Sequence, residues 1–193
     1  IDNDFDITII LPKDSSEYFT SKKTKNKIKY KKLFITTLSK KLDKLFQYLF
    51  YFFYEVYIIA KYLKKNNFDL IHISGGAWQF KSVLSSYIAG TKIIWHLNDA
   101  KMPKIIRLIF LLFSFMPSAF ICSSERTKEY YKKYMLKKNT PIFILYAPVN
   151  FKYINYKNTL KNDIKEKNKI KLITVANISP IKGLELIIEI AKK

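Results

Sequence analysis

Short apolar runs alternate with longer helix-like segments along most of the chain. The runs that predict strands are Phe5–Leu11, Asp69–Ser74, Ile93–Leu97, Ser118–Ser123 and Pro141–Tyr146. Continuous apolar runs of this length are typical of parallel strands that are buried on both faces. The segments that predict helices are Leu42–Leu63, Phe80–Ala89, Pro103–Met116 and Glu125–Leu136. This alternation indicates an α/β fold with a doubly wound parallel sheet.

The clearest unit runs from Phe68 to Asp99 and predicts a strand, a helix and a second, parallel strand. Gly75-Gly76 ends the first strand, and Gly90 lies where a helix C-cap glycine belongs. Ligands of such sheets bind beyond the carboxyl ends of the strands. Five polar residues stand at or near the carboxyl ends of these two strands: His72, Ser74, His96, Asn98 and Asp99. The only two histidines of the chain are among them. This placement indicates a site.

The pattern restarts after a charged stretch, Lys152–Lys169, that has little periodicity. Beyond it, Ile170–Val175 predicts a strand and Lys182–Lys193 a helix, with a turn between them. One strand and one helix cannot bury a core of their own. We therefore predict an N-terminal domain over residues 1–150, a linker over 151–169 and the beginning of a second domain over 170–193.

Two of the predicted helices, Leu42–Leu63 and Pro103–Met116, are strongly apolar. Their uninterrupted apolar runs are shorter than the roughly 20 residues that a transmembrane helix needs. The length favours a helix packed inside the protein. The alternative is a helix that lies in a membrane surface, with Lys61, Lys64 and Lys65 beside acidic headgroups. The Lys-rich stretch Ser15–Lys32 predicts a long polar loop.

The net charge is +20, from 35 Lys and Arg against 15 Asp and Glu. Such a charge favours an anionic partner, although a coding bias toward Lys would produce it as well. The single cysteine, Cys122, excludes an internal disulfide and is expected in the core. The N-terminus lacks the basic region of a signal peptide, so we expect a cytoplasmic protein.

Three stretches, taken in order, resemble the family 4 retaining glycosyltransferases of the GT-B fold. The first is FDLIHISGG followed by TKIIWHLND, which resembles two strand ends of that family. The second is AFICSSERTKEYY followed by ILYAPVN. The third is ITVANISPIKGLELIIEIAKK, which resembles the opening of the family's C-terminal domain. The resemblance extends over nearly the whole chain from Phe5 on, and its sharpest part is the SPIKG turn.

The resemblance implies two Rossmann-like domains, the second of which mainly holds a nucleotide-sugar donor. His96 corresponds to the family's histidine at the donor sugar, and we assign it as the catalytic residue. Lys182 corresponds to the lysine that binds the donor diphosphate, and Asn177 and Gly183 are assigned to donor binding beside it. Asn177 stands where the family often has Arg, so this chain lacks that positive charge.

The acceptor is implied to bind mainly to the N-terminal domain. We assign Asp99, Gly75, Gly76 and Ser124 to this acceptor or substrate side. Local capping remains the alternative for Asp99, and it is the favoured one for Ser124. The resemblance implies no metal and no cofactor, because the nucleotide sugar is a substrate.

We therefore expect a sugar transferase that acts with retention on a glycan or lipid-linked acceptor, with an anionic membrane surface as a further partner. The family's glycine-rich loop would precede Ile1 and its paired glutamates would follow Lys193, so these 193 residues alone are expected to be inactive. The alternatives are a basic nucleic-acid-binding domain and an inactive remnant. A nucleic-acid partner is not expected, because the sequence has no recognition helix, RNP motif or zinc-ligand spacing.

Overall fold

The computed structural model describes residues 5–15, 28–36, 42–147, 174 and 183–191. The chain divides into two units, residues 1–147 and 148–193. In the second unit the described element is helix α7, Leu184–Ala191. The predicted linker and turn lie outside the described residues, as does the predicted strand except for Thr174.

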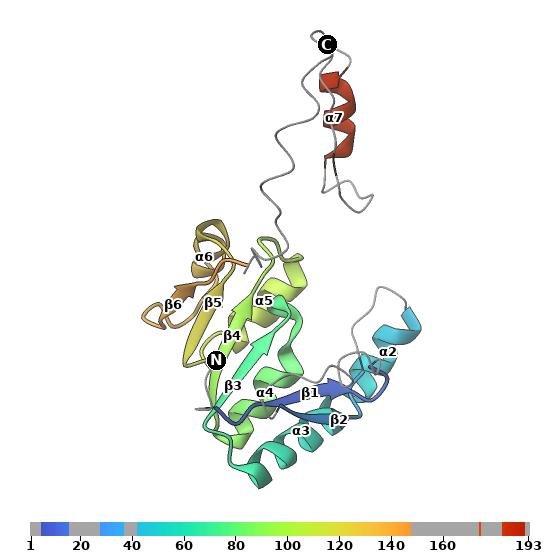
Figure 1. The fold of residues 1–193 in the computed structure, drawn as a ribbon, viewed down its shortest axis with the longest axis vertical. Helices are drawn as coiled ribbons and strands as arrows, with labels where there is room; N and C mark the ends of the chain where they lie inside the picture. Colours follow the sequence, from blue (N-terminus) through green and yellow to red (C-terminus); the bar gives the residue numbers. More distant parts are fainter. Residues whose placement is uncertain (1–4, 16–27, 37–41, 148–173, 175–182, 192–193) are drawn as a thin grey trace, which may run out of the picture. The chain divides into compact units, whose positions relative to one another are not determined.

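The first unit is built on a parallel four-stranded sheet in the order β3-β4-β5-β6 (Figure 1). The strands are β3 Leu70–Ser74, β4 Lys92–Leu97, β5 Ala119–Cys122 and β6 Ile142–Ile144. The segments between them form the short helix η1 and three α-helices: η1 Gly76–Trp78, α4 Phe80–Ala89, α5 Lys104–Phe113 and α6 Glu125–Lys132. The predicted α/β fold with a parallel sheet is thus confirmed.

Local sequence signals set the ends of the helices. Helix α4 has the predicted bounds, and Gly90 ends it with a φ of 74° while its N–H donates to the carbonyls of Ser86 and Tyr87. This left-handed conformation favours glycine because a Cβ would crowd the backbone. At the start of α6, the backbone N–H of Thr127 donates to the Ser124 hydroxyl over 3.2 Å. The prediction of a capping serine is therefore confirmed at Ser124.

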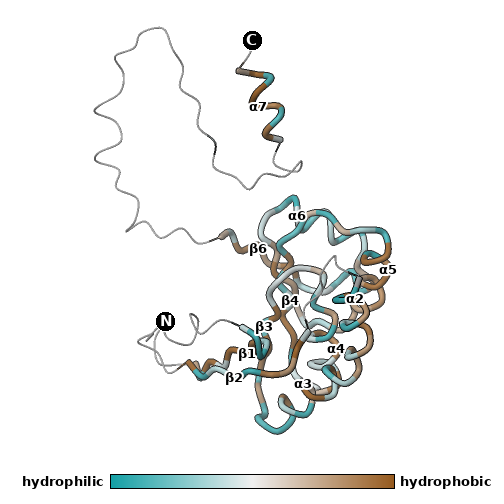
Figure 2. The backbone as a smooth tube through the Cα atoms, turned by 90° about the vertical axis from the view of Figure 1, so that its right-hand side faces the viewer, coloured by the Kyte–Doolittle hydropathy of each residue, from teal (hydrophilic) through white to brown (hydrophobic). Residues whose placement is uncertain are grey.

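One face of the sheet carries the core of the unit. Trp95 and Phe120 point to this face from neighbouring strands, and both are fully buried. Phe110 of α5 packs against the Trp95 ring at a centroid distance of 5.2 Å and against the Tyr131 ring of α6 at 5.0 Å. Figure 2 shows α4 and α5 on one side of the strands. Cys122 is buried in the same cluster, as predicted, and burial raises the pKa of its thiol to about 11.

The opposite face of the sheet is open in the described part of the chain, which corrects the prediction of strands buried on both faces. Leu70, His72 and Ser74 of β3 are exposed, and Phe143 of β6 is 58% exposed. Three consecutive crossovers of one hand, along a strand order that runs in one direction, place their helices on the same face. Strands with a continuous apolar sequence therefore have one face covered by helices and one face that is partly exposed.

The predicted helix Leu42–Leu63 is two helices, α2 Leu42–Phe50 and α3 Phe52–Asn66. Tyr51 separates them with a ψ of 1°, which lies outside the helical range. The sequence allowed either a helix packed inside the protein or a helix that lies in a membrane surface, and α3 has one side of each kind. Helix α3 buries one side, including Val56 and Leu63, and exposes Phe53 and Tyr57 on the other. No helix within the described ranges is both long and apolar enough to cross a bilayer.

A buried ion pair ties α3 to α4. Lys81 Nζ lies 2.6 Å from Glu55 Oε2, and both side chains are almost fully buried. Thr36 donates to the other Glu55 oxygen through its backbone N–H and its hydroxyl, at 3.0 and 2.7 Å. The Tyr48 ring of α2 lies 3.6 Å from the Lys81 ammonium. Burial lowers the pKa of Lys81, and the Glu55 carboxylate opposes that shift.

The N-terminal strands form a separate two-stranded parallel sheet, β1 Thr8–Pro12 with β2 Lys29–Leu33. The second strand corrects the prediction that Ser15–Lys32 is a loop throughout. Its lysines alternate poorly with apolar residues, so the sequence pattern does not show a strand. Backbone pairing with β1 supplies the missing stabilisation, and an ion pair of 2.7 Å joins Lys29 to Asp6.

Candidate functional site

The predicted site residues of the first unit gather at the carboxyl edge of the sheet. Because the strands are parallel, their carboxyl ends share one edge. Gly75 and Gly76 follow β3, Asp99 follows β4, and Ser124 follows β5. His96 is the penultimate residue of β4. The structure thus places these five residues along one edge, which is where ligands of open α/β sheets bind.

The two histidines contact each other on the open face. His72 Nε2 lies 3.2 Å from His96 Nδ1, and the rings are stacked with centroids 5.3 Å apart. His72 is exposed and lies outside the core. His96 is half-buried. Burial, followed by the charge of His72, lowers the pKa of His96.

Gly76 and Asp99 lie against each other at the ends of β3 and β4. Gly76 has a φ of +78°, and a Cβ built on it would lie 2.8 Å from Asp99 Oδ2. Only a glycine therefore lets the carboxylate come this close. The Trp95 Nε1–H donates to the Gly76 carbonyl over 2.9 Å, which anchors the turn to the core. Asp99 itself is exposed and open to a ligand.

Two hydrogen bonds hold the segment after β4 against the neighbouring elements. The Ser123 hydroxyl donates to the Asn98 carbonyl over 3.2 Å, and the Met102 N–H donates to the Tyr130 hydroxyl over 2.7 Å. The negative charge of Asp99 acts on Tyr131 as well, because burial first and Asp99 second raise the pKa of that phenol. Asp99 is thus carried on a backbone segment that is fixed from both sides.

Ser124 uses its hydroxyl locally. It accepts from the Thr127 N–H and lies 2.9 Å from the Thr127 hydroxyl. The capping alternative therefore describes a contact that exists in the structure. The substrate role that we assigned to Ser124 stays a prediction.

The predicted donor-binding residues belong to the second unit. Lys182 and Asn177 lie outside the described residues. Gly183 immediately precedes α7 and has a φ of +61°, and its carbonyl accepts from the Leu186 N–H over 3.1 Å. A positive φ at the start of a helix suits glycine. The donor side of the site therefore remains a prediction from the sequence.

The described side chains can bind an oxygen-rich ligand. The imidazole of His96 and the carboxylate of Asp99 offer a donor and acceptors to hydroxyl groups. Within the ranges that the structure describes, no cluster of three or more His, Cys, Asp or Glu could hold a metal ion. The metal-free mechanism that the resemblance implies stays a prediction.

Sequence reasoning missed the residues that organise this edge. It gave no role to Tyr130, and it did not predict the contact between His72 and His96. The pairing of Ser74 with His96 puts His72 and His96 on the same face of adjacent strands. Alternation along each strand shows which residues share a face of that strand, but the register between the strands must be known before residues of two strands can be called neighbours.

No protein-family model matches the sequence, and no curated protein matches it. Among solved structures, a glycosyltransferase from Rickettsia africae ESF-5 is similar, with a TM-score of 0.48 and 17% identity over 65% of this chain and 32% of that chain. The Anabaena protein Alr3699/HepE, solved in complex with UDP and glucose, also has a TM-score of 0.48, with 13% identity over 65% of this chain and 33% of that one. This chain thus spans about a third of the length of each.

Proposed function

We propose that this chain is part of a family 4, GT-B glycosyltransferase that moves a sugar from a nucleotide-sugar donor to a glycan or lipid-linked acceptor with retention, in the cytoplasm and as a step of polysaccharide biosynthesis. The observation that carries the proposal is the gathering of His96, Asp99 and Gly76 at one sheet edge. These are the residues to which the ordered motifs assign the acceptor side and the sugar contact. An edge of this kind is where an α/β sheet binds its ligand.

The proposed roles follow from the chemistry of each group. The His96 imidazole contacts the donor sugar, and the Asp99 carboxylate accepts hydrogen bonds from acceptor hydroxyls beside the Gly76 turn. Lys182, with Asn177 and Gly183, binds the donor diphosphate close to the start of a helix, where backbone N–H groups and the helix dipole favour an anion. The lysine also stabilises the charge that develops on the departing diphosphate.

Calorimetric titration with UDP-glucose and a guanosine diphosphate sugar tests the donor assignment. We expect one nucleotide sugar to bind the 193-residue chain without turnover, and the affinity to fall at least tenfold in Lys182→Ala because the diphosphate loses its cation. Lys192→Ala removes the same charge outside the SPIKG turn and serves as the matched control. Equal affinity of both variants for the nucleotide sugar would contradict the donor site, and release of free sugar by this chain would contradict its expected inactivity.

Helices α2 and α3 support a peripheral position on the membrane. Phe46 and Phe50 lie one turn apart on α2, Phe53 and Tyr57 lie one turn apart on α3, and these side chains are 71, 81, 77 and 61% exposed. On α3 the aromatic pair is followed by a basic segment, where Lys61 Nζ lies 5.8 Å from the Tyr57 ring centroid. An aromatic face that ends in lysines fits the boundary between acyl chains and anionic headgroups. A lipid-linked acceptor would lie at the same surface.

Cosedimentation with vesicles tests this position. We expect binding to vesicles that contain phosphatidylglycerol and much weaker binding to neutral vesicles. The double variant Phe50→Ser/Phe53→Ser is expected to lose most of the binding, because the apolar face is interrupted. Phe143→Ser removes a similarly exposed aromatic residue from the sheet face and should bind as the unmodified chain does. Equal binding of both variants would contradict the proposed membrane face.

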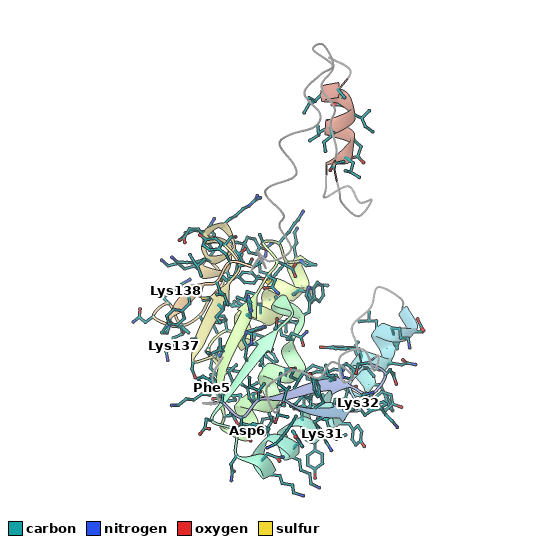
Figure 3. The ribbon with its side chains drawn as sticks, in the orientation of Figure 1. Phe5, Asp6, Lys31, Lys32, Lys137 and Lys138 are labelled. Carbon is teal, nitrogen blue, oxygen red and sulfur yellow. The ribbon has the colours of Figure 1, made fainter. Side chains whose placement is uncertain are left out.

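The nucleic-acid alternative finds less support in the distribution of charge. Figure 3 labels two pairs of lysines in the first unit: Lys31 and Lys32 lie on β2, and Lys137 and Lys138 lie before β6, well apart from them. All four are exposed. The two pairs are separated on the first unit, whereas a nucleic-acid site collects its cations along the backbone of the ligand.

A further inference from the structure

In the contact between His72 and His96, geometry and electrostatics together indicate which ring donates the hydrogen bond and which ring accepts it. The two nitrogen atoms that face each other are His72 Nε2 and His96 Nδ1, at 3.2 Å. A neutral imidazole has one protonated nitrogen and one accepting nitrogen, so one ring donates and the other accepts. The other nitrogen of His96, Nε2, takes no part in this contact.

The surroundings of His96 favour its role as the acceptor. On β3, His72 faces it, together with the uncharged Ser74 that pairs with it in register. On β5, the residue paired with His96 is Ile121, which has no titratable group. On its own strand Lys92 lies four residues back, and Asp99 follows the strand. His96 is half-buried whereas His72 is exposed, so the charge of an added proton is better hydrated on His72. Burial and the charge of His72 lower the pKa of His96 accordingly, and His96 is the ring that stays neutral when the pair takes up a proton.

The proton then has a defined place. If the added proton resides on His72, both nitrogens of His72 carry hydrogen and its Nε2–H points to His96 Nδ1. Neutral His96 accepts at Nδ1 and must carry its own hydrogen on Nε2. A carboxylate or carbonyl beside a histidine selects the opposite tautomer, because it accepts the Nδ1–H and leaves Nε2 as a base.

We propose that His72 is a positioning residue, which holds His96 in the tautomer that donates a hydrogen bond from Nε2 to an oxygen of the ligand. That the ligand oxygen belongs to a sugar rests on the proposed function. In this arrangement His96 cannot act as a general base through Nε2. It selects ligands that present a hydroxyl or ring oxygen as an acceptor, and it stabilises negative charge that develops on that oxygen.

Long-range nitrogen–proton NMR spectroscopy of the 15N-labelled 193-residue chain tests the proposal directly. The chain has only two histidines, so a single substitution assigns both imidazole signals. While the pair holds one added proton, we expect His96 to show a protonated Nε2 and an accepting Nδ1. In His72→Ala we expect a mixture of both tautomers and a His96 titration that moves to higher pH, since the neighbouring charge and part of the burial are lost.

Two further variants separate positioning from mere packing. His72→Gln keeps an N–H donor near the position of His72 Nε2, and it should retain the Nε2–H tautomer of His96. Leu70→Ala removes an exposed side chain from the same face of β3 and should change neither the tautomer nor the titration. An Nδ1–H tautomer in the unmodified chain, or a tautomer that is unchanged in His72→Ala, would overturn the proposal. Unchanged backbone amide signals show in each case that the variant is folded.

The outcome is independent of the proposed function, because these spectra need no nucleotide sugar. UDP-glucose is then added to the unmodified chain and to His72→Ala. A shift of the His96 signals that weakens in the variant extends the positioning role to a bound sugar. Absence of any shift in both chains, beside the expected tautomers, counts against the proposed donor site and leaves the assignment of His72 supported.

Discussion

The two faces of strand β4 differ in how much of them is covered. Trp95 points to one face and is fully buried, whereas His96, the next residue, is half-buried and contacts another imidazole on the other face. Helices cover the first face with Phe110 and Val83, both fully buried. The second face keeps Leu70 and Phe143 exposed at 49 and 58%.

The covered face of the strand contributes mainly to stability, whereas the open face carries the side chains that can bind a ligand. Apolar surface that is removed from water stabilises the fold by about 25 cal/mol for each Å², so the covered face supplies most of the stabilisation. A titratable ring on that face would lose its hydration and stay neutral. On the open face, the histidines keep access to solvent and to a ligand while the same strand holds them in place.

Truncation of a large aromatic residue on each face of the sheet tests this difference with the largest expected effect. We expect Trp95→Ala to reduce the free energy of unfolding by roughly 3–5 kcal/mol, since it leaves a cavity and removes the bond to the Gly76 carbonyl. Phe143→Ala is expected to cost less than about 1 kcal/mol because its ring is already exposed. Urea unfolding followed by circular dichroism measures both. Similar losses would mean that both faces are covered in solution.

The ion pair between α3 and α4 tests the layer behind the covered face. Glu55→Ala leaves the Lys81 ammonium buried without its partner, and we expect a loss of roughly 3 kcal/mol. This is the lower end of the usual range, because the Tyr48 ring still faces the ammonium.

The double variant Glu55→Ala/Lys81→Met removes both charges and should recover most of that stability in the same urea experiment. A double variant as unstable as Glu55→Ala would show that packing, not the unpaired charge, causes the loss.

The glycine at the carboxyl edge links the two faces. Gly76→Ala combines a positive φ with a Cβ that would lie 2.8 Å from Asp99 Oδ2, so we expect a loss of about 1–3 kcal/mol. Adding Asp99→Ala removes the clash but not the strain of the backbone, and it should restore only part of the stability. Thermal unfolding of the two chains measures the difference. Full recovery would mean that the φ angle relaxes freely.

The helix cap at Ser124 should have a smaller effect. Ser124→Ala removes the acceptor for the Thr127 N–H and is expected to cost about 1 kcal/mol. Ser124→Asp keeps an acceptor and adds a negative charge near the N-terminus of α6, so its stability should equal that of the unmodified chain. If Ser124→Asp also loses about 1 kcal/mol in urea unfolding, the cap is not the reason.

The smallest expected effect is the pH dependence that His96 brings. The pKa of His96 in the folded chain lies below the ordinary value of 6.5. At pH values between the folded pKa and 6.5, the unfolded chain therefore binds more protons than the folded chain. The contribution of His96 is therefore most favourable above pH 6.5 and declines as the pH falls from there to the folded pKa. His96→Gln should flatten this part of the stability curve in urea unfolding at a series of pH values. An unchanged slope would place the titration elsewhere.

Local patterns were sufficient for the covered side of the molecule. The bounds of α4, the left-handed Gly90 and the Ser124 cap follow from helical spacing and from the needs of unpaired backbone groups, which depend on neighbours only a few residues away. The order of strands and helices, and the gathering of His96 and Asp99 at one edge, follow from the rules of parallel sheets.

The open face, the histidine pair and the Glu55–Lys81 contact depended on distances across the fold. An apolar run in a strand does not reveal which of its faces a helix will cover, and alternation does not show which residues of two strands become neighbours. The division of α2 from α3 at Tyr51 is of the same kind, since the run is apolar on both sides of the break. For the histidine pair and the ion pair the partner is far away in the sequence, so its contribution exists only once the chain has folded.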